Sequence, residues 1–466
     1  MATDAPRRAT LLILALLTSA PFAHAQSNDE IQTATQFDLF PPGARSLALG
    51  GAFVALADDA TAAYSNPAGL TQLVEPEVAI EARHGTFRSQ FAERGHVPET
   101  ALTGIGIDVV DGLQRGEERN RAAGLAFASF TYPGTSPGNR PDNPAAKRWA
   151  VAIYGHQLTR FRSSLTSQGL FVGPRSAPFR TFPVRSSLDL DIAGIGAAGA
   201  YRLRDDFSVG FGLASYHLDL DSTTERFRRA EPTGDLLQDG LTGQFYGPAD
   251  FSPENVFNRQ LQRGSDDDLV FQAGFLWRLD SRWSLGGAYR QGPSFDFRAE
   301  FVEGPAGEAP GRVDPTVGGQ GTFRVPDVAA LGVALHATDQ WLITADYDWI
   351  RYSSLSDGLL NLLRAAIGAE NDFVIDDAHQ LHLGTEIQLL EPRFPVALRA
   401  GLWWDPDHRL RYVGDEALLA ARFRAGDDEL HLTAGAGIVF GRAQIDLAVD
   451  HADPVTTVSL SAVARF

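Results

Sequence analysis

The chain has 466 residues, no cysteine, one methionine and a formal net charge of −18 at pH 7. The absence of cysteine excludes thiolate nucleophiles, disulfides and cysteine-ligated zinc. Nucleic acids bind to basic surfaces, so a sequence pI of about 5.0 predicts no nucleic-acid partner. The length allows one large domain or two ordinary ones.

The N-terminus has the features of a secretory signal peptide. Two arginines precede the apolar run LLILALL at residues 11–17, and small residues at A-x-A spacing follow up to Ala25. The run is far shorter than the ~20 residues that a membrane-spanning helix needs. No later segment reaches that length. We therefore expect residues 1–25 to be a cleaved signal peptide and the exported chain to be soluble or to cross a membrane as strands.

The rest of the chain alternates with a period of two. In WSLGGAYR, from Trp283 to Arg290, the large apolar residues fall on one face and the other face is mostly small or polar. The stretches from Phe207 to Ala214 and from Trp341 to Trp349 show the same pattern. A soluble β-sandwich has this period too, but its strands are typically about 3 to 10 residues long, whereas these segments run to roughly ten to sixteen. Their length favours a membrane barrel.

About fourteen such segments follow one another along the chain. They are residues 76–90, 121–132, 148–163, 187–203, 206–221, 267–279, 283–298, 325–337, 340–352, 378–390, 395–405, 429–440, 443–451 and 455–466. Their connections mostly alternate between short and long, as in bacterial outer-membrane barrels with short periplasmic turns and longer extracellular loops. The stretch 132–147 should be short and is not, so it is either a long periplasmic turn or a sign of a wrong register. The prediction is an all-β transmembrane antiparallel β-barrel of about 14 strands over residues 75–466, in the bacterial outer membrane.

Aromatic residues fit this prediction. Candidates for the girdles at the two membrane interfaces are Trp149, Trp277, Trp283, Trp341, Trp349 and Trp404. The last predicted strand ends in Phe466, which resembles the C-terminal signal recognised in the assembly of outer-membrane barrels.

A Gly- and Ala-rich segment, FPPGARSLALGGAFVALADDATAAYSNPAGL at residues 40–70, precedes the first strand. Glycines permit close backbone approach, Pro67 fixes φ, and the Asn66 side chain can bond to neighbouring backbone, all of which suit a compact plug. The segment resembles the N-terminal part of the outer-membrane long-chain fatty acid and hydrophobic compound transporters of the FadL/OmpP1/TodX type. The residues that carry this resemblance are Gly43, Ala44, Gly50, Gly51, Ala52, Asp58, Asp59, Ala60, Asn66, Pro67, Ala68, Gly69 and Leu70.

The resemblance implies that residues 26–74 fold inside the barrel as a plug, or hatch. It also implies a function: uptake of long-chain fatty acids or similar hydrophobic small molecules through the plugged barrel. The same segment resembles that of secretion-associated barrels of the PorV type, which carry proteins, so a role in secretion or assembly is the alternative. The expected partners are a hydrophobic ligand and outer-membrane lipid, and we expect a monomer.

Charged residues on the strands are candidates for the lumen. The parity of the apolar faces turns Arg160, Arg290 and Arg399 inward, together with His382, Asp346, Asp348 and Glu386. These groups either form an ion-pair network that braces wall and plug, or one of the arginines binds a ligand carboxylate. Apolar residues of the helix-like loop at 354–370 could form an outer capture groove; Leu359, Leu363 and Ile367 are the candidates for substrate binding there.

Other motifs have plainer explanations. GIGAAG at residues 194–199 matches a dinucleotide-binding pattern but lies in an alternating strand. His379 and His382 would lie on opposite faces of a strand, which disfavours a shared metal. The acidic runs 266–268 and 427–429 read as solvated rim charge, with divalent bridging to lipid headgroups as the alternative. With no nucleophile elbow, we expect no enzyme activity, cofactor or metal.

Overall fold

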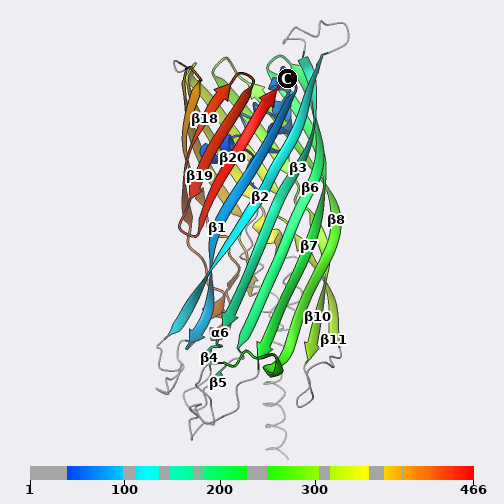
Figure 1. Ribbon diagram of the computed structural model, residues 1–466, viewed down its shortest axis with the longest axis vertical. Coiled ribbons are helices and arrows are strands. Elements are labelled where there is room, and N and C mark those ends of the chain that lie inside the picture. The colour runs from blue at the N-terminus through cyan, green and yellow to red at the C-terminus, as the bar shows by residue number, and fades with distance from the viewer. Residues whose placement is uncertain are drawn as a thin grey trace, which may run out of the picture.

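The protein forms a single β-barrel with a small N-terminal segment inside it (Figure 1). The computed structural model describes residues 39–97, 112–135, 147–172, 179–180, 183–227, 249–303, 315–355, 372–390 and 393–466. The predicted signal peptide lies outside these residues. No helix in the described part of the chain is long and apolar enough to cross a membrane.

The wall consists of long antiparallel strands. They are β1 (Glu77–Gly95), β2 (Leu113–Thr135), β3 (Lys147–Ser167), β6 (Val184–Arg204), β7 (Phe207–Phe227), β8 (Val256–Arg278), β9 (Trp283–Arg290), β10 (Ser294–Glu303), β11 (Pro315–Arg324), β12 (Val328–Thr338), β13 (Trp341–Ile350), β15 (Ala378–Leu389), β16 (Val396–Asp405), β18 (Glu429–Phe440), β19 (Ala443–His451) and β20 (Val455–Arg465). The two-residue strands β4 (Phe171–Val172), β5 (Phe179–Arg180), β14 (Phe373–Val374) and β17 (Arg411–Tyr412) pair outside the wall. The helical elements are α3 (Ala44–Ala48), α4 (Ala62–Ser65), η2 (Pro67–Gln72), η5 (Pro253–Asn255), η6 (Tyr352–Leu355) and α6 (Ala417–Arg422).

The barrel closes with fourteen strands, as the sequence predicted. β20 pairs with β1, and β8 pairs with both β9 and β10, while β12 pairs with β9 and β11 pairs with β10. β9 and β10 are therefore two halves of one strand interrupted at residues 291–293, and β11 and β12 are halves of the next, interrupted at residues 325–327. Pro293 and Pro326 lie in the interruptions, where a residue without an N–H cannot donate to the ladder.

Most of the tight turns lie at one end of the barrel, which we call the tight-turn end (Figure 1). The three-residue connection between β19 and β20 lies at the other end. Asp205 and Asp206 alone join β6 to β7, and Gly441 and Arg442 join β18 to β19, at the end where the chain terminates. The end of β2 also lies there, since Thr131 and Arg465 both pair with Glu77 of β1. The described ends of β2 and β3 that residues 136–146 connect therefore lie at the tight-turn end, and the strand order predicted for this part of the chain is correct.

Along the long strands, the apolar residues change from the outer face of the wall to its inner face. In the tight-turn half of β6, Ile195, Tyr201 and Leu203 are exposed on the outer face, whereas most of the inward residues are glycine or alanine. Toward the other end Leu188, Leu190 and Ile192 are buried inward and their neighbours Asp189 and Asp191 face out. Charge on the outer face does not suit hydrocarbon, so β6 extends past the apolar band and continues as a wall with an apolar interior.

The predicted girdle is present in part. Trp277, Trp283, Trp341 and Trp404 are exposed on the outer face. Trp149 and Trp349 are partly buried.

Candidate functional site

The N-terminal segment fills the tight-turn half of the lumen. We call its described part, residues 39–74, the plug. Asn66 is fully buried; its Nδ2 donates to the Val54 and Phe275 carbonyls, both at 2.9 Å, and its Oδ1 accepts the Ala68 N–H at 3.2 Å. Pro67 begins η2 directly after this cap. One side chain thus closes the turn, holds a second plug loop and ties both to β8.

The other residues of the plug motif have backbone or anchoring roles. Gly50 and Gly51 have φ of 66° and 83°, which L side chains rarely adopt. A Cβ on Gly69 would collide with the Ala57 carbonyl. Asp58 pairs with Arg45 at 2.6 Å. Asp59 accepts the Thr61 N–H at 2.8 Å, and burial raises the pKa of its carboxyl.

Wall glycines let the backbone of the plug lie directly against the strands. At seven positions a Cβ pointing from the wall would meet plug atoms, in most cases at less than normal contact distance. They are Gly210, Gly274, Gly286, Gly332, Gly384, Gly401 and Gly435, on β7, β8, β9, β12, β15, β16 and β18. We call this set the glycine belt. It leaves no room between the plug and this side of the wall.

Buried charges bind the plug to the wall. Glu386 of β15 accepts from Arg45 of the plug at 2.9 Å and from Arg399 of β16 at 2.6 Å, and Arg399 also pairs with Asp446 at 2.7 Å. Arg290 donates to the Ser65 and Leu39 carbonyls at 3.3 and 3.0 Å. The inward orientation predicted for Arg290 and Arg399 is correct, and both hold structure together.

Two more predicted lumenal side chains contact plug backbone. Asp346 accepts the N–H groups of Phe53 and Val54 at 2.7 and 2.8 Å. His382 lies 2.6 Å from the Gly50 carbonyl through Nδ1, so this nitrogen is the donor. Asp348 is also buried inward. The bracing network that the sequence left as one of two interpretations is present.

Arg160 does not point into the lumen as the sequence predicted. Leu158 and Thr159 are consecutive and both buried, and the ladder between β3 and β6 shifts between Gln157 and Thr159. Such a β-bulge adds one residue and reverses the parity of everything after it. Phe161 consequently faces in, and Arg160 leaves the buried face, where it pairs with Asp191 at 2.9 Å.

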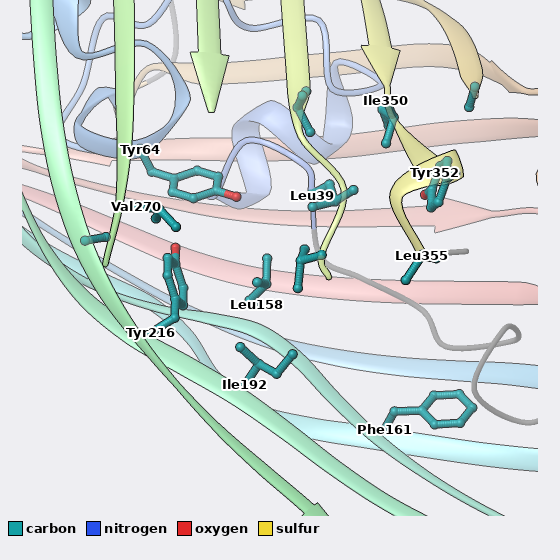
Figure 2. Packing of buried hydrophobic residues seen from close by; sticks show 14 of the residues in the cluster. Leu39, Tyr64, Leu158, Phe161, Ile192, Tyr216, Val270, Ile350, Tyr352 and Leu355 are labelled. Carbon is teal, nitrogen blue, oxygen red and sulfur yellow. The ribbon is translucent and has the colours of Figure 1, made fainter. Parts of the chain in front are cut away.

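Just beyond the plug, a stretch of the lumen is lined by apolar side chains. Figure 2 shows Leu158, Phe161 and Ile192 on one side of this region and Ile350, Tyr352 and Leu355 on another, while Tyr64 lies near Val270 and Tyr216. These residues come from β3, β6, β7, β8, β13, η6 and the plug. The predicted capture-groove residues Leu359, Leu363 and Ile367 lie outside the described residues.

The wall has an opening between β2 and β3. These strands pair only from Phe127 with His156 to Thr135 with Lys147. Farther from the tight turns, β2 pairs with β1 alone and β3 with β6 alone. At the far edge Glu118 rejoins the strands, accepting from Ser163 Oγ and Ser164 N at 2.9 and 2.7 Å. We call the gap between residues 119–126 of β2 and 157–162 of β3 the wall opening.

A cavity of about 570 Å³ connects the wall opening with the plug. Phe40, Leu47, Phe87 and Trp403 supply apolar surface, and Ala122 to Ala126 lie along the opening. Trp403 stacks on His431 with ring centroids 3.7 Å apart. At the rim, burial lowers the pKa of His408, but the neighbouring Asp405 outweighs it and the net pKa is raised. The cavity is therefore lined both by plug residues and by residues at the wall opening.

A second stretch of wall lacks the main-chain ladder, but side-chain hydrogen bonds join its strands. Between β8 and the β9/β10 break, Asp266 and Asp268 accept the N–H groups of Asp296 and Ser294 at 2.7 and 2.8 Å. These two carboxylates, predicted as solvated rim charge, replace missing backbone acceptors. Within the described residues no group of His, Cys, Asp or Glu could hold a metal.

Sequence reasoning missed the wall opening and the glycine belt. The belt has a sequence signal, since its glycines recur at inward positions of seven strands. The opening depends on which strand edges stay unpaired. The residues of a single strand do not show where its pairing with a neighbour stops.

A closed barrel with an apolar outer band, an internal plug and an apolar lumen defines an outer-membrane channel protein. The family model of the outer membrane protein transport proteins (OMPP1/FadL/TodX) matches residues 43–409, and the chain belongs to this family. The match favours transport over the secretion-associated alternative. No curated protein sequence matches the chain.

Solved structures share the fold. A Pseudomonas aeruginosa FadL homologue superposes with a TM-score of 0.55 at 15% identity, covering 89% of this chain and 96% of its own. The CymD monoaromatic hydrocarbon channel gives 0.52 at 14% identity, with coverage of 92% and 99%. The P. putida toluene transporter TodX gives 0.51 at 15% identity, also with 92% and 99%.

Proposed function

We propose that this outer-membrane transport protein takes up hydrophobic small molecules, long-chain fatty acids or compounds of similar apolarity, and releases them sideways through the wall opening. The observation that carries the proposal is the cavity of about 570 Å³ that joins the apolar lumen to this opening. The plug and the glycine belt block the straight path to the periplasm. A molecule that prefers hydrocarbon to water gains by leaving into the membrane.

Related proteins support the substrate class. The structural neighbours include a monoaromatic hydrocarbon channel and a toluene transporter. Sideways release also suits a lumen in which Arg290, Asp346 and His382 bind the plug and hold it in the straight path. We further propose that residues 1–25 are removed on export, that residues 26–74 form the plug and that the protein acts as a monomer.

Filling the wall opening tests the route of release. Gly124 lies at the opening, and a Cβ there would be 2.6 Å from Nη1 of Arg160. We expect Gly124→Phe to fill the opening and to lower uptake of a hydrophobic ligand at least severalfold. Gly155→Phe is the matched control, because a Cβ on Gly155 meets nothing closer than 3.9 Å.

The measurement is uptake of radiolabelled hexadecanoate and toluene by cells that lack their own transporter of this family. Both variants should keep wild-type amounts in the outer membrane and heat-modifiable migration in gels. Equal uptake by Gly124→Phe and Gly155→Phe would reject sideways release.

A further inference from the structure

Arg160 lies in the wall opening. Its Nε donates to Asp191 at 2.9 Å, its Nη2 donates to Gln157 at 2.9 Å, and its Nη1 reaches the Ala123 carbonyl of β2 at 3.5 Å. The last distance joins strands that share no ladder at this level. The guanidinium also occupies the space that the missing side chain of Gly124 leaves. A ligand that passes between β2 and β3 must pass this group.

Arg160 keeps unused hydrogen-bonding capacity at an accessible position, whereas Arg290 and Arg399 are buried. A guanidinium carries five N–H groups, and these contacts use three of them, one at the limit of hydrogen-bond length. The side chain is 39% exposed, whereas that of Arg399 is 2% exposed and engaged by two carboxylates. Of the three predicted arginines, only Arg160 can meet a ligand without loosening the plug.

The level of Arg160 in the wall fits an amphiphile. Just toward the tight turns, Leu125, Ile153 and Ile195 are exposed on the outer face at 54%, 63% and 74%. Just beyond Arg160 the outer face carries Arg162 and Asp189, which pair with each other. The opening therefore lies at the edge of the apolar band, where an acyl chain could enter hydrocarbon while its head group stays among charges.

We propose that Arg160 determines the specificity of the wall opening by binding the carboxylate of an acidic amphiphile as its apolar chain leaves the lumen. The inference rests on the proposed function and names its preferred substrate class, long-chain carboxylic acids over neutral compounds of equal chain length. Arginine binds carboxylates through two parallel N–H groups. Asp191 competes for the same guanidinium, which keeps the ligand weakly held and lets it leave.

The test compares hexadecanoate with 1-hexadecanol, which has the same chain and no charge at neutral pH. Uptake of both is measured in cells producing wild type, Arg160→Gln or Asp191→Asn. Arg162→Gln is the matched control, because Arg162 is the next outward arginine and pairs with Asp189 at 2.9 Å in the same way. The readout is the ratio of acid to alcohol uptake, which a general loss of folding or opening leaves unchanged.

We expect Arg160→Gln to lower the ratio of acid to alcohol uptake about fivefold. This factor corresponds to about 1 kcal/mol, which lies between the free energies of an exposed ion pair and of a charge-assisted hydrogen bond. Asp191→Asn should raise the ratio, since it removes the competing carboxylate, and Arg162→Gln should leave it alone. A ratio unchanged by Arg160→Gln, or a fall of both ligands together, would overturn the role of Arg160 while uptake itself stands. If wild type takes up neither ligand above cells without the protein, the proposed function fails instead.

Discussion

At the residue scale, the plug depends on a few side chains that satisfy backbone groups out of reach of water. Asn66 serves three such groups, the Val54 and Phe275 carbonyls and the Ala68 N–H. Asparagine suits this position because its amide both donates and accepts. Gly274 of β8 completes the fit, since a Cβ there would collide with the side-chain oxygen Oδ1 of Asn66.

Replacing Asn66 should therefore loosen the plug locally. Asn66→Ala leaves three buried groups without a partner, and we expect a loss of about 2 kcal/mol or more. This corresponds to roughly 30-fold faster amide hydrogen exchange across residues 50–72 if exchange proceeds by local opening. Asn255→Ala is the control, because Asn255 bonds to Ser252 in a short surface helix. Exchange in the plug that matches wild type would contradict the role of Asn66.

At the element scale, irregularities in the strands create the functional features. The bulge at Leu158 lies where β3 stops pairing with β2, and the ladder between β1 and β2 shifts at the same level. The breaks at 291–293 and 325–327 leave a gap in the ladder that aspartates close. Bulges bend a strand and increase its twist. The period-two pattern predicted the fourteen strands and the orientation of Arg290 and Arg399. It failed at Arg160, because one inserted residue reverses parity and both Leu158 and Thr159 are plausible on an inward face.

Deleting Leu158 should make β3 regular. In the ladder with β6, Gln157 pairs with Ala193 and Thr159 with Ile192, so Leu158 is the extra residue and its removal leaves every later side chain on its present face. We expect a straighter β3, a narrower wall opening and uptake of hexadecanoate reduced severalfold. Deletion of Gly441 from the exposed turn between β18 and β19 controls for shortening the chain. If the Leu158 deletion variant assembles normally and takes up hexadecanoate as well as wild type, the bulge is not needed for transport through the wall opening.

At the scale of the whole molecule, the outer face of the barrel suits hydrocarbon along one part of its length and water along the rest. The outer face is apolar along the membrane band and charged beyond it, while the lumen is filled by plug backbone near the tight turns and by apolar side chains farther out. The sequence predicted a plug from motif resemblance. It could not predict how the plug is seated, because that depends on glycines and charges contributed by strands hundreds of residues away, such as Gly401 and Asp446.

Removal of the plug should convert the protein into an open pore. The wall strands make their ladders with each other from β1 to β20, so deleting residues 40–72 leaves the main-chain pairing intact. Glu386, Arg399, Asp346 and the glycine belt would then face water, which solvates them and lets ions pass. We expect single-channel conductance in planar bilayers to rise from near the baseline to a stable open level, with heat-modifiable migration unchanged. Arg45→Ala is the graded comparison, because it breaks the pairs with Asp58 and Glu386 but keeps the plug backbone; it should give brief openings only. A correctly assembled deletion variant that conducts no more than wild type would show that the wall itself, not the plug, closes the path to the periplasm.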